Sequence, residues 1–125
     1  MSVSSSMTEK AVLYQIAREV LEQATVPILG PMASEAVFFH LKQRMDREPG
    51  EVLVEDPKRF YEEFVNVLAS GADILLEHVG KCITDNYGVS CSSEEFIGLF
   101  YRGNESSKEK IVEILSAIDE KTKRK

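Results

Sequence analysis

The sequence predicts an all-α protein, a four- to five-helix bundle with one long central helix. Three observations indicate this class: apolar residues recur at three- and four-residue steps, Ser-x-x-Glu capping boxes precede some of these segments, and no two segments alternate as paired strands do. The 125 residues, 43% of them hydrophobic, are enough to bury a core, and no linker or repeat divides them. We therefore predict a single domain over residues 1–125, with flexible ends at 1–6 and 121–125.

The first helix is predicted over about residues 8–24. Ser6 and Glu9 have the spacing of a capping box, in which each side chain bonds the backbone amide of the other residue. Pro27 is expected to end the helix, because proline lacks an amide donor and restricts the residue before it. The apolar positions between them form one stripe: Leu13, Ile16, Ala17, Val20, Leu21 and Ala24.

A second helix is predicted over about residues 31–47, with Gly30 as its N-cap. Phe38 and Phe39 are adjacent and widen its apolar face beyond that of a simple amphipathic surface helix. Residues 51–55 are apolar at their centre, but no other segment could pair with them as a strand. We expect them to form an apolar loop that lies against the core.

The longest helix is predicted over about residues 57–86, and its wide apolar surface predicts a central position. Asp56 and Pro57 are its expected N-cap and first residue. Gly71 and Gly80 lie inside the segment, where each costs about 1 kcal/mol relative to alanine. They indicate close packing or a break, and we expect another helix to cross at Gly71.

Two shorter helices are predicted in the last third of the chain. The first follows a Gly88 stop, begins at a capping box formed by Ser92 and Glu95, and ends at Gly103. The second begins at a further box, from Ser106 to Glu109, and continues to about residue 122.

Composition and charge exclude several functional classes. Residues 1–120 have a net charge of −10 and residues 121–125 add +4, so nucleic acid is an unexpected partner for the body of the protein. No apolar run approaches the roughly 18–20 residues that span a bilayer, and the first residues do not resemble a signal peptide. We therefore expect no membrane contact, two free thiols and a cytoplasmic location.

Motifs of the common enzyme and cofactor classes are absent. There is no phosphate-binding glycine loop, CxxC pair, HExxH, EF-hand loop or GxSxG. The adjacent acids at 62–63 and 94–95 point about 100° apart on a helix, so they do not converge on one substrate atom. The sequence therefore predicts a protein that is not an enzyme and needs no cofactor.

A zinc site is an alternative that the histidines and cysteines allow. His78 and Cys82 are four residues apart on one helix face, and Cys91 and His40 could complete a tetrahedral set. The spacings match no common zinc motif, and both helix residues lie in an apolar stripe. We favour a core histidine and buried thiols over a metal site.

The aromatic residues suggest two kinds of binding site in addition to the core. One is an interface, for which Val12 and Leu13 of the first helix and Phe38 of the second are the candidates, since only one of two adjacent phenylalanines can face inward. The other is an apolar pocket between helices, with these lining candidates: Phe39, His40, Phe64 and His78.

Three segments carry a family resemblance: Glu35 to Leu41, Asp56-Pro57 with the phenylalanines that follow, and Gly71 to Glu77. Over about residues 33–101 the chain resembles small archaeal all-helical domains that occur alone or as output domains of signalling proteins. The resemblance implies a helical bundle and a regulatory or sensing context. Such domains have no established biochemical activity, so it assigns no functional residue.

The function predicted from these observations is a regulatory or protein-interaction module without enzymatic activity. Its expected partner is a second copy of the chain, as a homodimer, or another protein. The alternatives are a sensor that binds an apolar ligand between helices and, less favoured, the zinc module.

Overall fold

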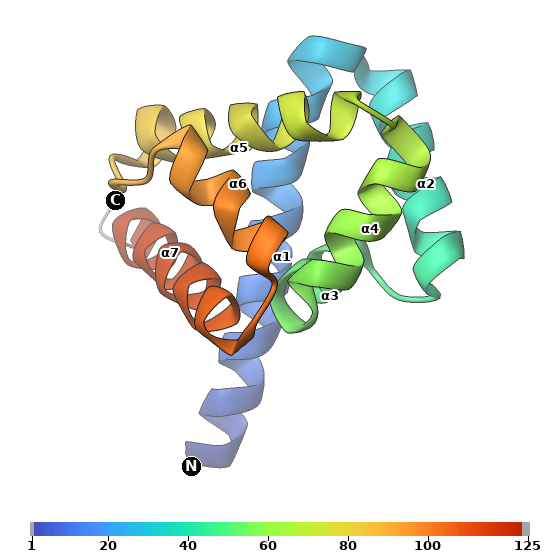
Figure 1. Ribbon diagram of the computed structural model, residues 1–125. Helices are drawn as coiled ribbons and strands as arrows, with labels where there is room; N and C mark the ends of the chain where they lie inside the picture. The colour runs from blue at the N-terminus through green and yellow to red at the C-terminus, as the bar shows by residue number, and fades with distance from the viewer. Residues whose placement is uncertain (1, 124–125) are drawn as a thin grey trace.

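The computed structural model describes residues 2–123 of the chain, with side chains from Lys10 to Thr122. Within these residues it contains seven helices and no strand, which confirms the all-α class and corrects the expected number of helices (Figure 1). Of the predicted basic end, Arg124 and Lys125 lie outside the described residues. The helices are α1 (Ser2–Leu29), α2 (Pro31–Met45), α3 (Pro49–Glu55), α4 (Pro57–Leu68), α5 (Gly71–Tyr87), α6 (Ser93–Arg102) and α7 (Glu105–Lys123).

Helix α1 is the central element of the fold. It packs against α2, α3, α5 and α7, and Figure 1 shows it running through the middle of the molecule. The prediction of a central helix at residues 57–86 is therefore wrong. The apolar side chains that α1 buries belong to the stripe expected from the sequence: Ile16, Ala17, Val20, Leu21 and Ala24.

Both ends of α1 differ from the prediction. The helix already includes Ser2, so Ser6 lies inside it and is not its N-cap. It also continues through Pro27 to Leu29. Pro27 lies on the exposed side of the last turns, where the carbonyl that loses its donor can bond to water instead.

The segment predicted as one long helix consists of α4 and α5, which are joined at Ala69 and Ser70. Ala69 has φ 53° and ψ −131°, and Ser70 has φ −65° and ψ −17°. These are close to the angles of the two central residues of a type II′ turn, whose first position usually holds glycine. An alanine occupies that position here, and the chain turns sharply between the two helices.

The expected helix crossing at Gly71 is wrong, and the crossing lies at Gly80 instead. A Cβ atom on Gly71 would come no closer than 3.9 Å to its neighbours, the nearest being Leu68 of its own chain segment. A Cβ atom on Gly80 would lie 3.2 Å from both the Ser93 Cα and the Phe96 Cβ atoms. Glycine therefore lets the backbone of α6 approach α5 at this point.

Residues 51–55, expected as a loop, belong to helix α3. Pro49 is its first residue, a position that proline favours because the amide it lacks would have no partner there. The expected packing of this segment against the core is confirmed, because Val52, Leu53 and Val54 are at most 3% exposed.

Most of the predicted helix caps are confirmed. The Asp56 carboxylate accepts a hydrogen bond from the Arg59 amide at 3.3 Å, and Ser92 and Glu95 form the complete capping box. Gly88 and Gly103 end their helices with positive φ angles, as predicted.

The third expected cap, at Ser106, is wrong. Asn104 directly precedes α7 and caps it, because its side-chain oxygen accepts a hydrogen bond from the Ser107 amide at 2.9 Å.

One hydrophobic cluster joins all seven helices. Each helix contributes at least one side chain that is under 4% exposed, for example Val20, Phe38, Val52, Phe60, Leu76, Phe96 and Ile111.

No helix in the described part of the chain is long and apolar enough to cross a membrane.

Candidate functional site

The four predicted pocket residues do not converge on one space. Phe64 is fully buried in the core, where its ring stacks on Phe60 with 5.1 Å between the centroids. Phe39 and His40 lie side by side on the outer surface of α2, with 6.1 Å between their ring centroids. His78 is half-buried on α5. The structure therefore gives no support to an apolar pocket formed by this set.

The four possible zinc ligands are not assembled either. Among the side chains described from residue 10 to residue 122, no three histidine, cysteine or acidic residues are placed to hold one metal ion. His40 is on the surface of α2, whereas Cys91 is buried beside α6. Burial raises the pKa of the Cys82 and Cys91 thiols, so both groups favour the neutral form.

The predicted interface residues face inward to different degrees. Val12 and Leu13 are half-buried and pack against the core. Phe38 is only 3% exposed, and the Arg18 guanidinium lies 4.4 Å from the centroid of its ring. Its neighbour Phe39 is 59% exposed, so the outward member of the adjacent pair is Phe39 and not Phe38.

An exposed apolar face covers the outer side of α2 and the end of α1. It consists of Ile28, Met32, Ala36 and Phe39, and we call it the α2 face. Met32 is 86% exposed and Ile28 is 47% exposed. The positions in α2 follow helical spacing, so they line one side of that helix. The opposite side of α2 is buried, and a helix that is apolar on both sides normally has neighbours on both.

Ile28 and Met32 were not among the surface residues predicted from the sequence. A usable signal was present, because residues 28–41 contain no aspartate, lysine or arginine and only one glutamate, Glu35. A surface helix with so little charge is unusual and indicates a covered face. Figure 1 places α2 along one edge of the molecule, where its outer side meets no other helix of the described chain.

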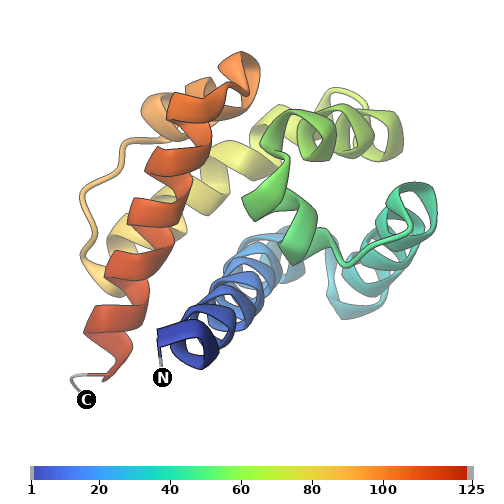
Figure 2. The ribbon, with the colours of Figure 1, turned by 90° about the horizontal axis from the view of Figure 1, so that it is seen from below.

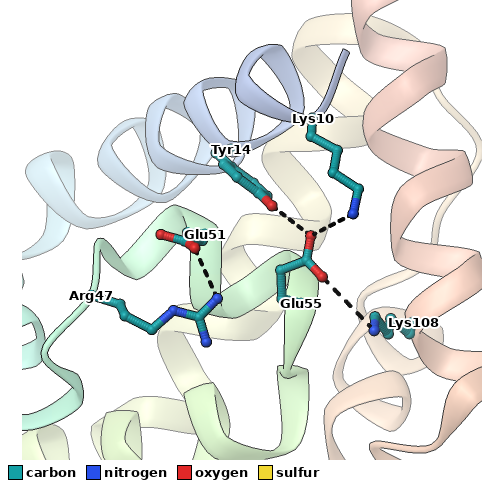
Figure 3. Close-up of polar contacts among 6 residues, drawn as sticks. All are labelled: Lys10, Tyr14, Arg47, Glu51, Glu55 and Lys108. Atoms are coloured by element: carbon teal, nitrogen blue, oxygen red, sulfur yellow. Dashed lines mark hydrogen bonds and ion pairs between the residues drawn. The ribbon is translucent and has the colours of Figure 1, made fainter. Parts of the chain in front are cut away.

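A polar cluster centred on Glu55 ties α1, α3 and α7 together (Figure 3). The Tyr14 hydroxyl donates a hydrogen bond of 2.5 Å to the Glu55 carboxylate. The ammonium groups of Lys10 and Lys108 lie 3.8 Å and 3.9 Å from the same carboxylate. Lys10 and Tyr14 belong to α1 and Lys108 belongs to α7, so Glu55, the last residue of α3, connects all three helices.

The protonation states of this cluster suit a structural role. The hydrogen bond from Tyr14, with smaller contributions from the two lysines, lowers the pKa of Glu55. Burial and the neighbouring carboxylate raise the pKa of Tyr14 to about 12. At neutral pH the acid is therefore ionised and the phenol protonated, so neither group is poised to exchange a proton.

A second cluster joins α4, α5 and α6 through Asp73. The Tyr61 and Tyr101 hydroxyls donate hydrogen bonds of 2.7 Å and 2.6 Å to the two oxygens of its carboxylate. The two phenol rings also meet edge to face at 5.4 Å. Burial raises the pKa of Tyr61, and the hydrogen bond to Asp73 raises that of Tyr101. Both phenols remain protonated and hold the three helices together.

No family model matches the chain, and no curated protein or solved structure matches it either.

Proposed function

We propose that this protein is a non-enzymatic interaction module that self-associates through the α2 face. The observation that supports this proposal is the exposure of Met32 and Phe39, at 86% and 59%, on the outer side of a helix whose inner side is fully packed. Exposed apolar residues that adjoin one another are typical of protein-binding surfaces, whereas single ones are common on any protein. Covering them with a second apolar face removes them from water.

Charge favours a second copy as the partner. The body of the protein is strongly acidic, so two copies repel each other over most of their surfaces. The α2 face is nearly uncharged and is therefore a place where like copies can meet. Glu35 precedes Phe39 by four residues and Lys42 follows it by three.

An antiparallel arrangement makes these charges complementary. When two copies of α2 pack antiparallel with their Phe39 side chains facing each other, Glu35 of one copy lies within about 1.5 Å, along the helix axis, of Lys42 of the other. Lys42 is also 2.9 Å from Glu48 of its own chain, but its side chain is 59% exposed and can reach across the interface.

The size of the α2 face limits the strength of the dimer. The 15 residues of α2 span about 22 Å, and a strip one helix wide covers much less than the roughly 800 Å² per partner of a standard interface. We therefore propose a weak dimer that forms and dissociates readily. Such behaviour fits a regulatory role better than that of a permanent structural subunit.

We also propose that the protein acts in signalling in the cytoplasm. The resemblance to archaeal output domains supports a role in signalling, and the two free thiols support a cytoplasmic location. The protonation states of the Glu55 and Asp73 clusters and of the thiols support binding without covalent chemistry.

Sedimentation velocity over a range of micromolar concentrations tests the dimer. We expect the wild type to shift from monomer to dimer as its concentration rises, and Phe39→Glu to remain a monomer because it places two carboxylates at the centre of the interface. Ile74→Glu is the matched control, since Ile74 is equally exposed at 61% but lies on α5. A wild type that stays monomeric throughout contradicts the proposal, as does equal loss of dimer in both variants.

A charge exchange tests the antiparallel arrangement. Glu35→Lys should weaken the dimer by placing two cations opposite each other, and adding Lys42→Glu should restore it. A double variant no stronger than Glu35→Lys alone contradicts the antiparallel contact, while leaving the test of Phe39 unaffected.

A further inference from the structure

A second exposed apolar surface lies where α5 meets α6. Ile74 of α5 is 61% exposed and Tyr101 of α6 is 56% exposed. Both adjoin Asp73, because Ile74 follows it in the chain and the Tyr101 hydroxyl donates a hydrogen bond of 2.6 Å to its carboxylate. The two side chains therefore belong to one surface, which we call the α5–α6 surface.

The hydrogen bonds to Asp73 fix the shape of this surface. Its two carboxylate oxygens accept from the Tyr61 and Tyr101 hydroxyls, so both phenol rings are held in place. The rings meet at an interplanar angle of 80°, and part of the Tyr101 ring is open to solvent. A phenol that donates to a carboxylate has an electron-rich ring, and such a ring attracts a cation to its face.

The Glu77 carboxylate also belongs to the α5–α6 surface. At about 100° per residue, Glu77 lies about 40° around the helix from Asp73, on the side of Ile74. The hydrogen bond to Asp73 raises the pKa of Tyr101, and the charge of Glu77 contributes in the same direction. Glu77 is therefore near the Tyr101 hydroxyl, and the surface combines an aromatic ring, an aliphatic side chain and two carboxylates.

These two carboxylates have no cationic partner. Among the described residues, neither Asp73 nor Glu77 forms an ion pair. Lys81 follows Glu77 by one turn, but its ammonium group lies 3.7 Å from Asp85. Residues 1–120 have a net charge of −10, so the rest of the protein adds to the negative potential. A basic partner is therefore attracted to this surface, whereas a second acidic copy of the chain is repelled.

We propose that the α5–α6 surface binds a basic segment of another protein through an arginine side chain. The guanidinium of the partner stacks on the Tyr101 ring and pairs with Glu77, and an apolar side chain of the same segment packs on Ile74. Arginine fits this surface better than lysine, because its planar guanidinium both stacks on an aromatic ring and bonds a carboxylate through two N–H groups. The same carboxylates repel anionic partners such as nucleic acid.

This proposal is independent of the α2 face. Figure 2 shows α2 and α6 on different sides of α1. Ile74 takes no part in the proposed dimer and is the control residue in its test, so either proposal can fail without the other.

NMR titration of the isotope-labelled full chain with short synthetic peptides tests the surface. The probe is the peptide Ac-Arg-Leu-Arg-Leu-Arg-NH₂, and two comparison peptides replace every arginine by lysine or by glutamate. We expect saturable shifts at residues 71–78 and 97–102 with the arginine peptide, weaker binding of the lysine peptide and no shifts with the glutamate peptide.

Three results of this titration overturn the proposal. The first is the absence of saturable shifts with the arginine peptide. The second is shifts spread over all acidic parts of the surface, which would mean that only net charge attracts the peptide. The third is a lysine peptide that binds as tightly as the arginine peptide, which would remove the stacked guanidinium.

Two substitutions at Tyr101 separate its ring from its hydroxyl. Tyr101→Leu removes the aromatic face and should weaken binding of the arginine peptide by about fivefold, the factor expected for one exposed cation–π contact. Tyr101→Phe also loses the hydrogen bond to Asp73 but keeps the ring, so it should bind more tightly than Tyr101→Leu. Equal affinities of the two variants would show that Tyr101 acts only by holding Asp73, and this result overturns the ring contact.

A matched pair of charge variants tests the role of Glu77. Glu77→Gln should weaken binding of the arginine peptide by about threefold, the factor expected for one exposed ion pair. Glu109→Gln is the control, because Glu109 is an exposed acid on α7, outside the α5–α6 surface. An equal loss of affinity in both variants contradicts a contact with Glu77.

Discussion

Replacing Gly50 by alanine should separate α3 from α1. A Cβ atom at residue 50 would lie inside contact distance of the Tyr14 carbonyl oxygen and 3.2 Å from the Arg18 amide nitrogen. These are backbone atoms of a packed helix, so they cannot rotate away as the end of a side chain can. Helix α3 must therefore move outward, and the gap opens above Val52 and Val54, which are at most 3% exposed.

Two opposing effects decide the magnitude. Alanine gains up to about 1 kcal/mol over glycine from helix propensity. Overpacking costs about 1–3 kcal/mol when side chains can adjust, and more when the obstacle is backbone. We expect the Gly50→Ala variant to lose about 2–4 kcal/mol of unfolding free energy, which lowers the Tm by about 10 °C for a chain of this size.

Gly71→Ala is the matched control for this experiment. Its Cβ atom would have 3.9 Å of space, and neither glycine has a positive φ angle, so the two variants differ mainly in the room available. Gly71→Ala should be neutral or stabilise the protein by about 0.4–1 kcal/mol. Urea unfolding followed by circular dichroism measures both variants. Equal unfolding free energies for the two would refute the close α1–α3 approach.

Two further predictions concern the polar groups. Tyr14→Phe should cost about 1–2 kcal/mol of unfolding free energy at neutral pH, because it removes a hydrogen bond to an ionised acid. The pKa of Glu55 is lowered in the folded state, so this stabilisation is present at neutral pH and is lost as the pH falls through that pKa. The free-energy cost of Tyr14→Phe, measured by urea unfolding, should therefore be smaller in acid. An equal cost at neutral and acid pH would contradict the assignment. Cys91 is 6% exposed and its thiol pKa is raised by burial, so it should react slowly with a thiol reagent in the native protein and rapidly in denaturant. Fast labelling of Cys91 without denaturant would show that its surroundings open readily.

The helix caps could be predicted because a few adjacent residues determine them. Asp56 before a proline, the box of Ser92 and Glu95, and glycine at residue 103 each satisfy backbone groups within one turn of themselves. Such interactions depend little on the rest of the chain, so local sequence is sufficient.

The boundaries imposed by packing could not be predicted in the same way. Gly71 was the only local sign of a break between α4 and α5, and it was interpreted as a helix crossing. The turn itself is at Ala69, which adopts a φ angle that is usually reserved for glycine. Such a conformation costs about 1–3 kcal/mol and persists because the packed helices on both sides hold it. The start of α3 also depends on packing. Glycine is required at residue 50 because the backbone of α1 lies against it, and the local sequence does not show this contact.

The binding surfaces were accessible to sequence reasoning only in part. The adjacent phenylalanines indicated that one ring faces outward, but the choice of Phe39 over Phe38 depends on which side of α2 meets α1 and α4. The burial of Ser107 was not predicted, because the expected cap at Ser106 gave α7 the wrong starting point. Ser107 precedes Ile111 by one helical turn, and the structure buries both residues on the same side of α7.

The central position of α1 has a consequence for the order in which the protein folds during synthesis. This helix leaves the ribosome well before α5 and α7, two of the helices against which it packs. Ala17 and Val20 of α1 border the same small apolar gap as Val79 of α5 and Ile111 of α7. Until α7 emerges, one side of α1 therefore lacks its native cover, and a nascent chain of this protein is a candidate for chaperone binding through that side.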